Sequence, residues 1–134
     1  MPTVFISHSA NDRKRVEEEI LHFLWNRNID TWYASNAIET ASEFKEEITK
    51  GLKQCDWFLV VISSKSIKSD WVKAEVDWAL NNRSKRIILI LLDNCNIFDL
   101  DLRLTKYQYI DFRKKSRQSQ LKITRIIWKH ENDI

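Results

Sequence analysis

The amino-acid sequence predicts an α/β domain with a central, parallel, five-stranded sheet and helices on both faces. Two apolar runs, 57–62 and 87–92, are rich in Val, Ile and Leu and lack polar alternation, which is typical of strands buried on both sides. Segments with helical spacing of apolar residues separate the expected strands, and this alternation predicts parallel pairing. The chain has 134 residues, which suits a single domain spanning 1–134.

Three shorter strands complete the predicted sheet. Residues 3–6 form an apolar strand near the start of the chain, and residues 30–33 form a short aromatic one. Residues 109–111 have the weakest strand pattern, so we expect this fifth strand at an edge of the sheet.

A first helix is expected over residues 12–26, with Asp12 as its N-terminal cap. Its apolar face is made by Val16, Ile20, Phe23 and Leu24.

Three further helices are expected over 42–52, 69–82 and 116–128. Gly51 lies near the C-terminal end of the second of them. A less regular segment, 93–106, separates the last two strands.

Composition excludes several classes of function. The net charge is only +3 and basic residues are spread among 19 acidic ones, so we expect no nucleic-acid partner. The densest basic run, 113–115 with Arg117, is interpreted as the solvated start of a helix. Gly51 is the one glycine, which excludes glycine-rich phosphate loops.

Cysteine usage and hydropathy indicate the setting of the protein. Cys55 and Cys95 form no CxxC pair and no zinc spacing with the histidines, so we expect neither a metal nor a disulfide framework. A reducing cytoplasm is the simplest location. No apolar run approaches the roughly 20 residues of a membrane span, and no membrane partner is expected.

Ligands of open parallel sheets bind beyond the carboxyl ends of the strands, which directs attention to the segments that follow them. Phosphoacceptor domains of this topology carry acids there, whereas this chain has Ser7-His8 and Ser63-Ser64, which excludes that function. A serine nucleophile is not favoured, because the chain has no Gly-x-Ser-x-Gly turn and the only nearby histidine is His8. Serines at strand ends usually satisfy backbone groups.

The helix that follows the third strand carries a more specific pattern. At about 100° per residue, Trp71, Glu75 and Trp78 lie together along one border of the apolar stripe. A partly desolvated carboxylate in an aromatic cleft is a recurrent catalytic arrangement. Spacing alone also fits, and rather favours, a surface acid beside two packing tryptophans.

Five segments in order resemble TIR (Toll/interleukin-1 receptor) domains along nearly the whole chain. They are 4–9, 28–32, 51–63, 69–75 and 111–112. The fourth, Ser69-Asp70-Trp71-Val72-Lys73-Ala74-Glu75, is similar to the family's S-x-W-x-x-x-E signature. His8 stands where the family usually has Tyr, and Thr40-Ala41 stands where Pro-Gly is common. The resemblance implies a flavodoxin-like fold.

The resemblance to NAD-cleaving bacterial members implies which residues form the site. Glu75 takes the place of the catalytic carboxylate, and Trp71 that of a substrate-contacting residue. The loop 34–42 corresponds to the family's BB loop, which contributes to substrate binding and to contacts between protomers. The other predicted substrate-binding residues are Ser7, His8, Ser9, Trp32, Ser35, Asn36, Ile38, Phe44 and Ser69.

The function implied by this resemblance is cleavage of the nicotinamide–ribose bond of NAD+, giving nicotinamide with ADP-ribose or a cyclic ADP-ribose isomer. NAD+ is then the substrate, and no cofactor is expected. The resemblance also implies self-association of TIR protomers, an N-terminal regulatory or oligomerising segment in a longer protein, and a role in bacterial signalling, defence or virulence.

Two other functions remain open on the sequence. Many TIR domains are scaffolds that bind other TIR domains without catalysis, although an adaptor does not need the glutamate of the signature. A glycosidase related to nucleoside deoxyribosyltransferases also uses a glutamate on a similar sheet, and a substrate screen would separate it.

Overall fold

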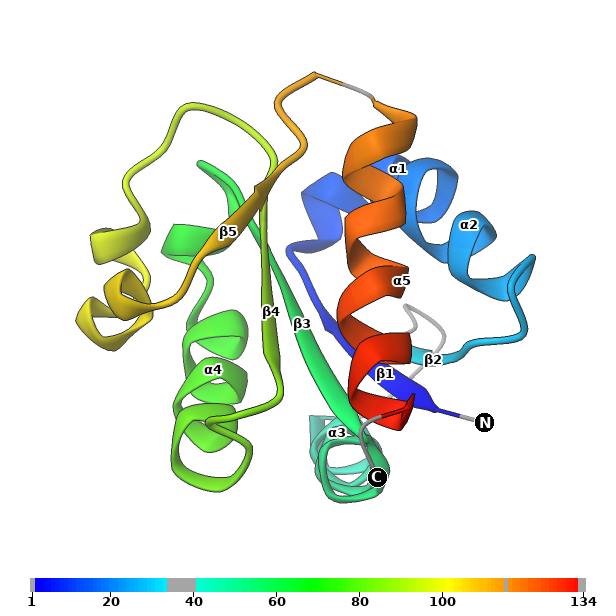
Figure 1. Cartoon of the computed structure of the whole chain (residues 1–134). Coiled ribbons are helices and arrows are strands. Elements are labelled where there is room, and N and C mark those ends of the chain that lie inside the picture. Colours follow the sequence, from blue (N-terminus) through cyan, green and yellow to red (C-terminus); the bar gives the residue numbers. More distant parts are fainter. Residues whose placement is uncertain (1, 34–40, 115, 133–134) are drawn as a thin grey trace.

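A computed structural model describes residues 2–33, 41–114 and 116–132 of the chain (Figure 1). Five parallel strands form one sheet in the order β2-β1-β3-β4-β5, which confirms the predicted fold class. The strands are β1 (Thr3–Ser7), β2 (Asp30–Tyr33), β3 (Trp57–Ile62), β4 (Ile87–Leu91) and β5 (Tyr109–Asp111). As predicted, β5 is an edge strand.

Helices cover both faces of the sheet (Figure 1). They are α1 (Arg13–Val16), α2 (His22–Trp25), α3 (Ala41–Gln54), α4 (Asp70–Asn82) and α5 (Arg117–Asn132). The helix α3 begins one residue earlier than expected and ends two residues later, and α5 continues four residues beyond its predicted end. Two short 3-10 helices, Ile97–Asp99 and Leu102–Lys106, lie in the segment expected to be irregular.

The sheet divides the core into two halves, and the alternation of β1 shows how. Val4 and Ile6 pack in the half covered by α1, α2 and α5. Phe5 packs in the half covered by α3 and α4. Successive strand residues point to opposite faces, so Ser7 belongs on the α3 and α4 face, like Phe5.

The first helix is less regular than expected. A 3-10 turn at Ala10–Asp12 leads into α1, and a π-helical turn, Glu17–Leu21, connects α1 to α2. Asp12 stands at the N-cap position of α1, as predicted, but its side chain makes no capping hydrogen bond. Ser9 caps this start by accepting a hydrogen bond from the amide of Asn11, because the Asp12 carboxylate is engaged by the hydroxyl of Ser63.

Gly51 allows α3 to pack directly on β2. A Cβ atom at this position would lie 2.4 Å from the nearest ring atom of Trp32. The Trp32 ring in turn stacks on Phe5, with ring centroids 4.9 Å apart. The single glycine of the chain therefore serves a close helix–strand approach and not a phosphate loop.

The guanidinium of Arg15 joins the first helix to the far half of the sheet. It donates to the backbone oxygens of Leu92 and Phe112, which follow β4 and β5, at 3.1 and 2.9 Å. It also pairs at 2.6 Å with Glu19, a carboxylate that is buried. Sequence reasoning missed this contact, although the i, i+4 spacing of Arg15 and Glu19 is a readable sign of it.

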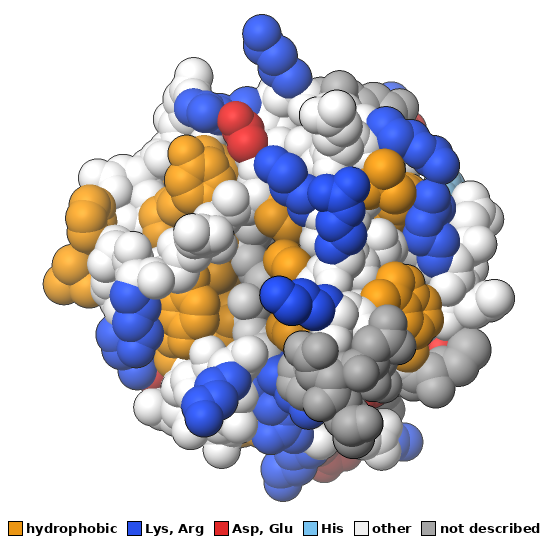
Figure 2. Space-filling view, in the orientation of Figure 1, with side chains coloured by type: hydrophobic (Ala, Val, Ile, Leu, Met, Phe, Trp, Pro, Cys, Tyr) orange, Lys and Arg blue, Asp and Glu red, His pale blue; other side chains and the backbone are white. Residues whose placement is uncertain are grey.

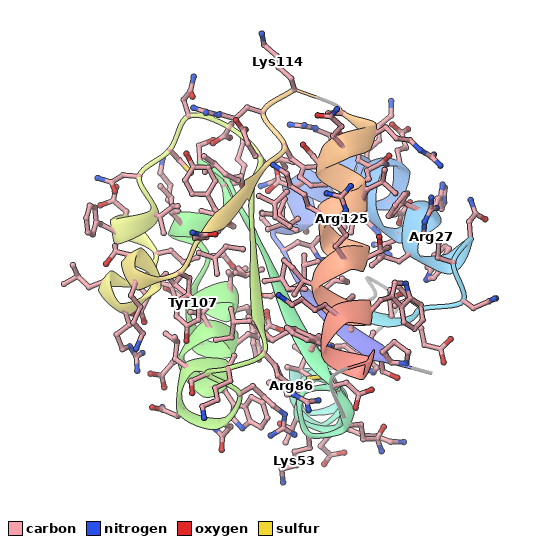
Figure 3. The ribbon with its side chains drawn as sticks, in the orientation of Figure 1. Arg27, Lys53, Arg86, Tyr107, Lys114 and Arg125 are labelled. Atoms are coloured by element: carbon pink, nitrogen blue, oxygen red, sulfur yellow. The ribbon has the colours of Figure 1, made fainter. Side chains whose placement is uncertain are left out.

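Lys and Arg side chains are spread over the face that α5 presents (Figure 2). In the stick view Arg27, Lys53, Lys114 and Arg125 extend outwards from separate parts of the fold (Figure 3). These four cations therefore do not converge on one place. In the described part of the chain, no helix has the length and apolar character needed to cross a membrane.

Candidate active site at the carboxyl edge of the sheet

A buried carboxylate lies beside the carboxyl end of β1. The Glu75 side chain, on the second turn of α4, belongs to a residue that is 6% exposed. Its Oε1 accepts a hydrogen bond of 2.8 Å from the hydroxyl of Ser7, the last residue of β1. Helical spacing was compatible with a surface acid or with a residue at the border of the apolar stripe. In the structure Glu75 belongs to the buried face of α4.

Strand register explains why Ser7 and Glu75 are in contact although they are 68 residues apart in sequence. Ser7 pairs with Val60 in the parallel ladder, and the Val60 side chain packs in the core half covered by α4. The helix buries Val72, Val76 and Ala79 against that same half. Glu75 lies between these apolar positions along the helix, so its carboxylate faces the sheet where β1 ends.

Burial controls the charge of Glu75. Desolvation raises the pKa of its carboxyl from 4.5 to about 7, because the ionised form loses contact with water. The hydrogen bond from Ser7 acts in the opposite direction and lowers the pKa. A carboxyl group with this pKa exchanges its proton near neutral pH, as catalytic acids and bases do.

The start of α4 positions the two other signature residues. Ser69 caps the helix, and its hydroxyl accepts a hydrogen bond of 3.3 Å from the amide of Val72. Trp71 lies one turn before Glu75 and is 45% exposed, so its indole is accessible beside the buried carboxylate. Trp78 is half-buried against the core, with the Arg83 guanidinium over its ring.

His8 and Ser9 follow Ser7 at the carboxyl end of β1. Nδ1 of His8 lies 3.3 Å from the carbonyl oxygen of Ile6, and burial lowers the pKa of the imidazole. The charges that act on His8 include those of Arg13, Asp12 and Glu17, at the start of the first helix. Ser9 is buried as the cap described above. Their roles toward a substrate stay predictions.

Of the remaining predicted residues, the structure describes the side chain of Trp32 alone. Trp32 packs between Phe5 and Gly51, which is a structural role. Ser35, Asn36 and Ile38 lie outside the described residues, as does the side chain of Phe44.

Hydrogen bonds from serines hold the rest of this edge together. Ser63, directly after β3, donates to Asp12 at 2.5 Å, and its hydroxyl also accepts from the backbone amide of Ser66. The amide and hydroxyl of Ser64 both bind Asp93, which follows β4, at 3.0 Å. These serines thus satisfy backbone groups and carboxylates, as serines at strand ends usually do.

Two surface hollows lined by described residues include neither Glu75 nor Ser7 in their lining. One of about 480 Å³ is lined by Glu46, Lys50 and Lys53 on the outer side of α3. Another, of about 630 Å³, is lined by Asp111 and Arg113 near the start of α5. The carboxylate is identified instead by its burial, its partner and its place at the sheet edge.

The fold and the site together define an α/β domain that has a parallel five-stranded sheet, a buried glutamate at its carboxyl edge and an exposed tryptophan one helical turn away. Residues 4–127 match the family model described as TIR domain. The chain belongs to the TIR domain family.

Curated relatives include proteins named as a cyclic ADP-D-ribose synthase and as an NAD(+) hydrolase. The probable 2' cyclic ADP-D-ribose synthase TcpO of Methanobrevibacter olleyae is 26% identical over 99 residues, which cover 73% of this chain and 29% of the relative. The NAD(+) hydrolase TcpC of Escherichia coli O6:H1 is 23% identical over 120 residues, covering 87% of this chain and 38% of the relative. The chain thus spans well under half the length of these relatives.

Solved structures share the fold. The TIR domain of the Toll-related receptor TRR-2 from Hydra magnipapillata superposes with a TM-score of 0.71 at 21% identity, covering 97% of this chain and 94% of that one. The CMP N-glycosidase BcmB of Clostridium botulinum superposes with a TM-score of 0.66 at 23% identity, covering 88% and 94%.

Proposed function

We propose that this domain cleaves the bond between nicotinamide and ribose in NAD+, with Glu75 as the catalytic carboxylate. The observation that carries the proposal is the buried Glu75, bonded to Ser7 at the carboxyl edge of the sheet with Trp71 exposed one turn away. The relatives named as NAD(+) hydrolase and cyclic ADP-D-ribose synthase support the choice of substrate.

The chemistry suits a single carboxylate. Nicotinamide leaves as a neutral molecule, so no general acid is needed for the leaving group. Positive charge develops on the ribose as the bond breaks, as in glycoside cleavage, and an ionised Glu75 stabilises that charge. The exposed indole of Trp71 supplies a face on which a cationic nicotinamide ring stacks. Neither a metal nor a resident cofactor enters this scheme.

The protonation of Glu75 predicts how activity depends on pH. Since the ionised form is the active one and burial raises the pKa of the carboxyl to about 7, activity rises as the pH increases through about 7. A bound nicotinamide cation lowers the pKa of Glu75 by charge attraction. The pH midpoint of kcat should therefore lie below that of kcat/KM.

Water completes hydrolysis to ADP-ribose, whereas exclusion of water lets the adenosine end of the same molecule attack and gives a cyclic isomer. The relatives include proteins named for each outcome, so we propose both products for this domain. We also propose that self-association completes the site, in which case activity rises faster than linearly with protein concentration.

The test is incubation of concentrated protein with NAD+, with free nicotinamide and ADP-ribose products measured by chromatography and mass. Wild type should release nicotinamide, and Glu75→Gln should keep the fold, by circular dichroism, and release none. Glu18→Gln, at an exposed position of the first helix, is the matched control. A folded Glu75→Gln variant with wild-type turnover would refute the catalytic assignment.

A parallel incubation with CMP separates a nucleotide N-glycosidase, which has a related fold, from an NAD-cleaving enzyme. Release of cytosine without release of nicotinamide would show that the substrate is CMP and not NAD+. Turnover of neither compound at any protein concentration, with self-association intact, would favour the scaffold.

A further inference from the structure

The hydrogen bond from the Ser7 hydroxyl to Glu75 joins β1 to α4, and both residues are buried, at 1% and 6% exposure. The bond is 2.8 Å long, an ordinary length for a hydroxyl that donates to a carboxylate. Ser7 had been expected to contact substrate. Its hydroxyl proton is instead directed at the carboxylate, which gives this serine a different role.

The bond anchors one carboxylate oxygen and leaves the other for a ligand. Within the described part of the chain, the structure gives Glu75 one hydrogen-bond partner, Ser7, and that partner takes Oε1. A glutamate side chain has three rotatable bonds, so an unanchored carboxylate would sample several positions. With Oε1 fixed, the position of Oε2 relative to the sheet edge is fixed as well.

The anchor itself is rigid. Ser7 ends β1, which is paired on both sides, with β2 and with β3. Catalytic groups held by regular elements are placed more accurately than groups held by loops. Glu75 and Ser7 thus connect the helix that carries the carboxylate to a central strand of the sheet.

The bond also depends on charge. An ionised carboxylate only accepts hydrogen bonds, and the Ser7 hydroxyl donates one proton, so the pair fits the ionised form of Glu75 best. Ser7 consequently lowers the pKa of Glu75 and offsets part of the increase that burial causes. A residue with a purely structural role would not change the charge of the carboxyl.

We propose that Ser7 is the positioning residue of the site: its hydroxyl holds one oxygen of Glu75 so that the other faces the reacting ribose. The proposal rests on the NAD-cleaving function proposed above. Ser7 does not touch substrate in this scheme, and it acts through Glu75. It extends the S-x-W-x-x-x-E signature on α4 by a partner on β1.

The first measurement is the pH dependence of nicotinamide release by Ser7→Ala. We expect the rising limb of kcat/KM to move up by about one pH unit or more, because the ionised form has lost its donor. A move of the limb from pH 7 to pH 8 lowers the ionised fraction at pH 7 about fivefold, so activity there should fall about fivefold or more. Only part of the loss should recover at high pH, because the ionised carboxylate is then no longer held in place. Ser7→Thr, which restores the hydroxyl, should return the profile toward that of wild type.

The second measurement is independent of activity. A pH titration of the Glu75 carboxyl followed by carbon NMR should show a higher pH midpoint in Ser7→Ala than in wild type. Ser7→Cys, whose thiol is a weak donor, should have an intermediate midpoint. The matched control is Ser119→Ala, another buried serine, whose hydroxyl donates to the backbone oxygen of Asp111 on the other side of the sheet. This variant should leave both the profile and the midpoint unchanged.

The two measurements separate the two proposals. If wild type releases no nicotinamide yet Ser7→Ala raises the Glu75 midpoint, the proposed function fails and the Ser7–Glu75 coupling stands. If wild type is active and Ser7→Ala changes neither the profile nor the midpoint, Ser7 is only a packing residue and the positioning role is refuted. Complete recovery of Ser7→Ala activity at high pH would refute it too, because the serine would then set the charge of Glu75 without positioning it.

Discussion

Burial keeps water from the Glu75 carboxyl, whose residue is 6% exposed, and this costs the ionised form more than the neutral one. Glu75→Gln should therefore stabilise the protein at neutral and alkaline pH. Folding raises the pKa of Glu75, which means that the native state holds the proton more tightly than the unfolded state. Both states are protonated well below pH 4.5. Between 4.5 and about 7 the unfolded state ionises first, and stability falls as the pH rises. Above about 7 that loss is complete.

The size of the effect follows from the two pKa values. The gap between 4.5 and about 7, at 1.36 kcal/mol per pH unit, corresponds to about 3 kcal/mol of lost stability above pH 7. By the linkage relation, about 2.5 kcal/mol of this loss falls between pH 5 and pH 9. Glutamine stays neutral, and its side-chain oxygen still accepts from Ser7, so the variant escapes the loss.

The assay is urea unfolding of wild type and Glu75→Gln at pH 5 and at pH 9. We expect the advantage of the variant to be larger at pH 9 by about 2.5 kcal/mol. Glu18→Gln, at an exposed position, corrects for the removal of one carboxyl group. An advantage of equal size at both pH values would show that the native pKa is not raised, and the reasoning from burial would be wrong.

Three substitutions test other contacts. Gly51→Ala should destabilise the fold by about 1–2 kcal/mol in thermal unfolding, because the clash with Trp32 outweighs the gain in helix propensity. In a Trp32→Val background the same change should stabilise, and destabilisation there would rule out the clash. Arg15→Ala should cost about 2 kcal/mol in urea unfolding by leaving the buried Glu19 carboxylate unpaired, and an effect below about 0.5 kcal/mol would contradict this. Trp71→Ala should change the free energy of unfolding by less than about 1 kcal/mol, since the residue is 45% exposed, but raise KM for NAD+ or change the product ratio. Unaltered kinetics and products would make Trp71 a surface residue only.

The architecture could be predicted because it depends on local pattern. The buried strands at Trp57–Ile62 and Ile87–Leu91 follow from unbroken apolar runs, and the apolar face of the first helix follows from its spacing. The absence of a capping hydrogen bond from the Asp12 side chain could not be predicted in this way. The Asp12 carboxylate accepts a hydrogen bond from the hydroxyl of Ser63, which is 51 residues away in sequence, in place of one from the amides of its own helix.

The candidate site could be predicted only in part, because it too depends on contacts between residues that are far apart in sequence. Helical spacing placed Glu75 next to the apolar stripe, but its depth depends on what packs against the helix. Ser7 is recognisable as the end of a strand, whereas its bond to Glu75 depends on the register of β1 with β3 and on the position of α4. Alternation along β1 was a usable signal, because it predicts which sheet face each residue reaches.

The alternation of β1 also bears on how the chain tolerates insertions and deletions. One residue added within Thr3–Ser7 would exchange the two faces beyond the insertion, turning Ser7 toward α1 and a neighbouring side chain toward α4. Pairing with β2 and β3 would survive, since backbone hydrogen bonds do not depend on side chains. Insertions after Ser7, before the first helix, would leave both faces intact. Length variation among relatives of this chain should therefore be tolerated after the strand and absent within it.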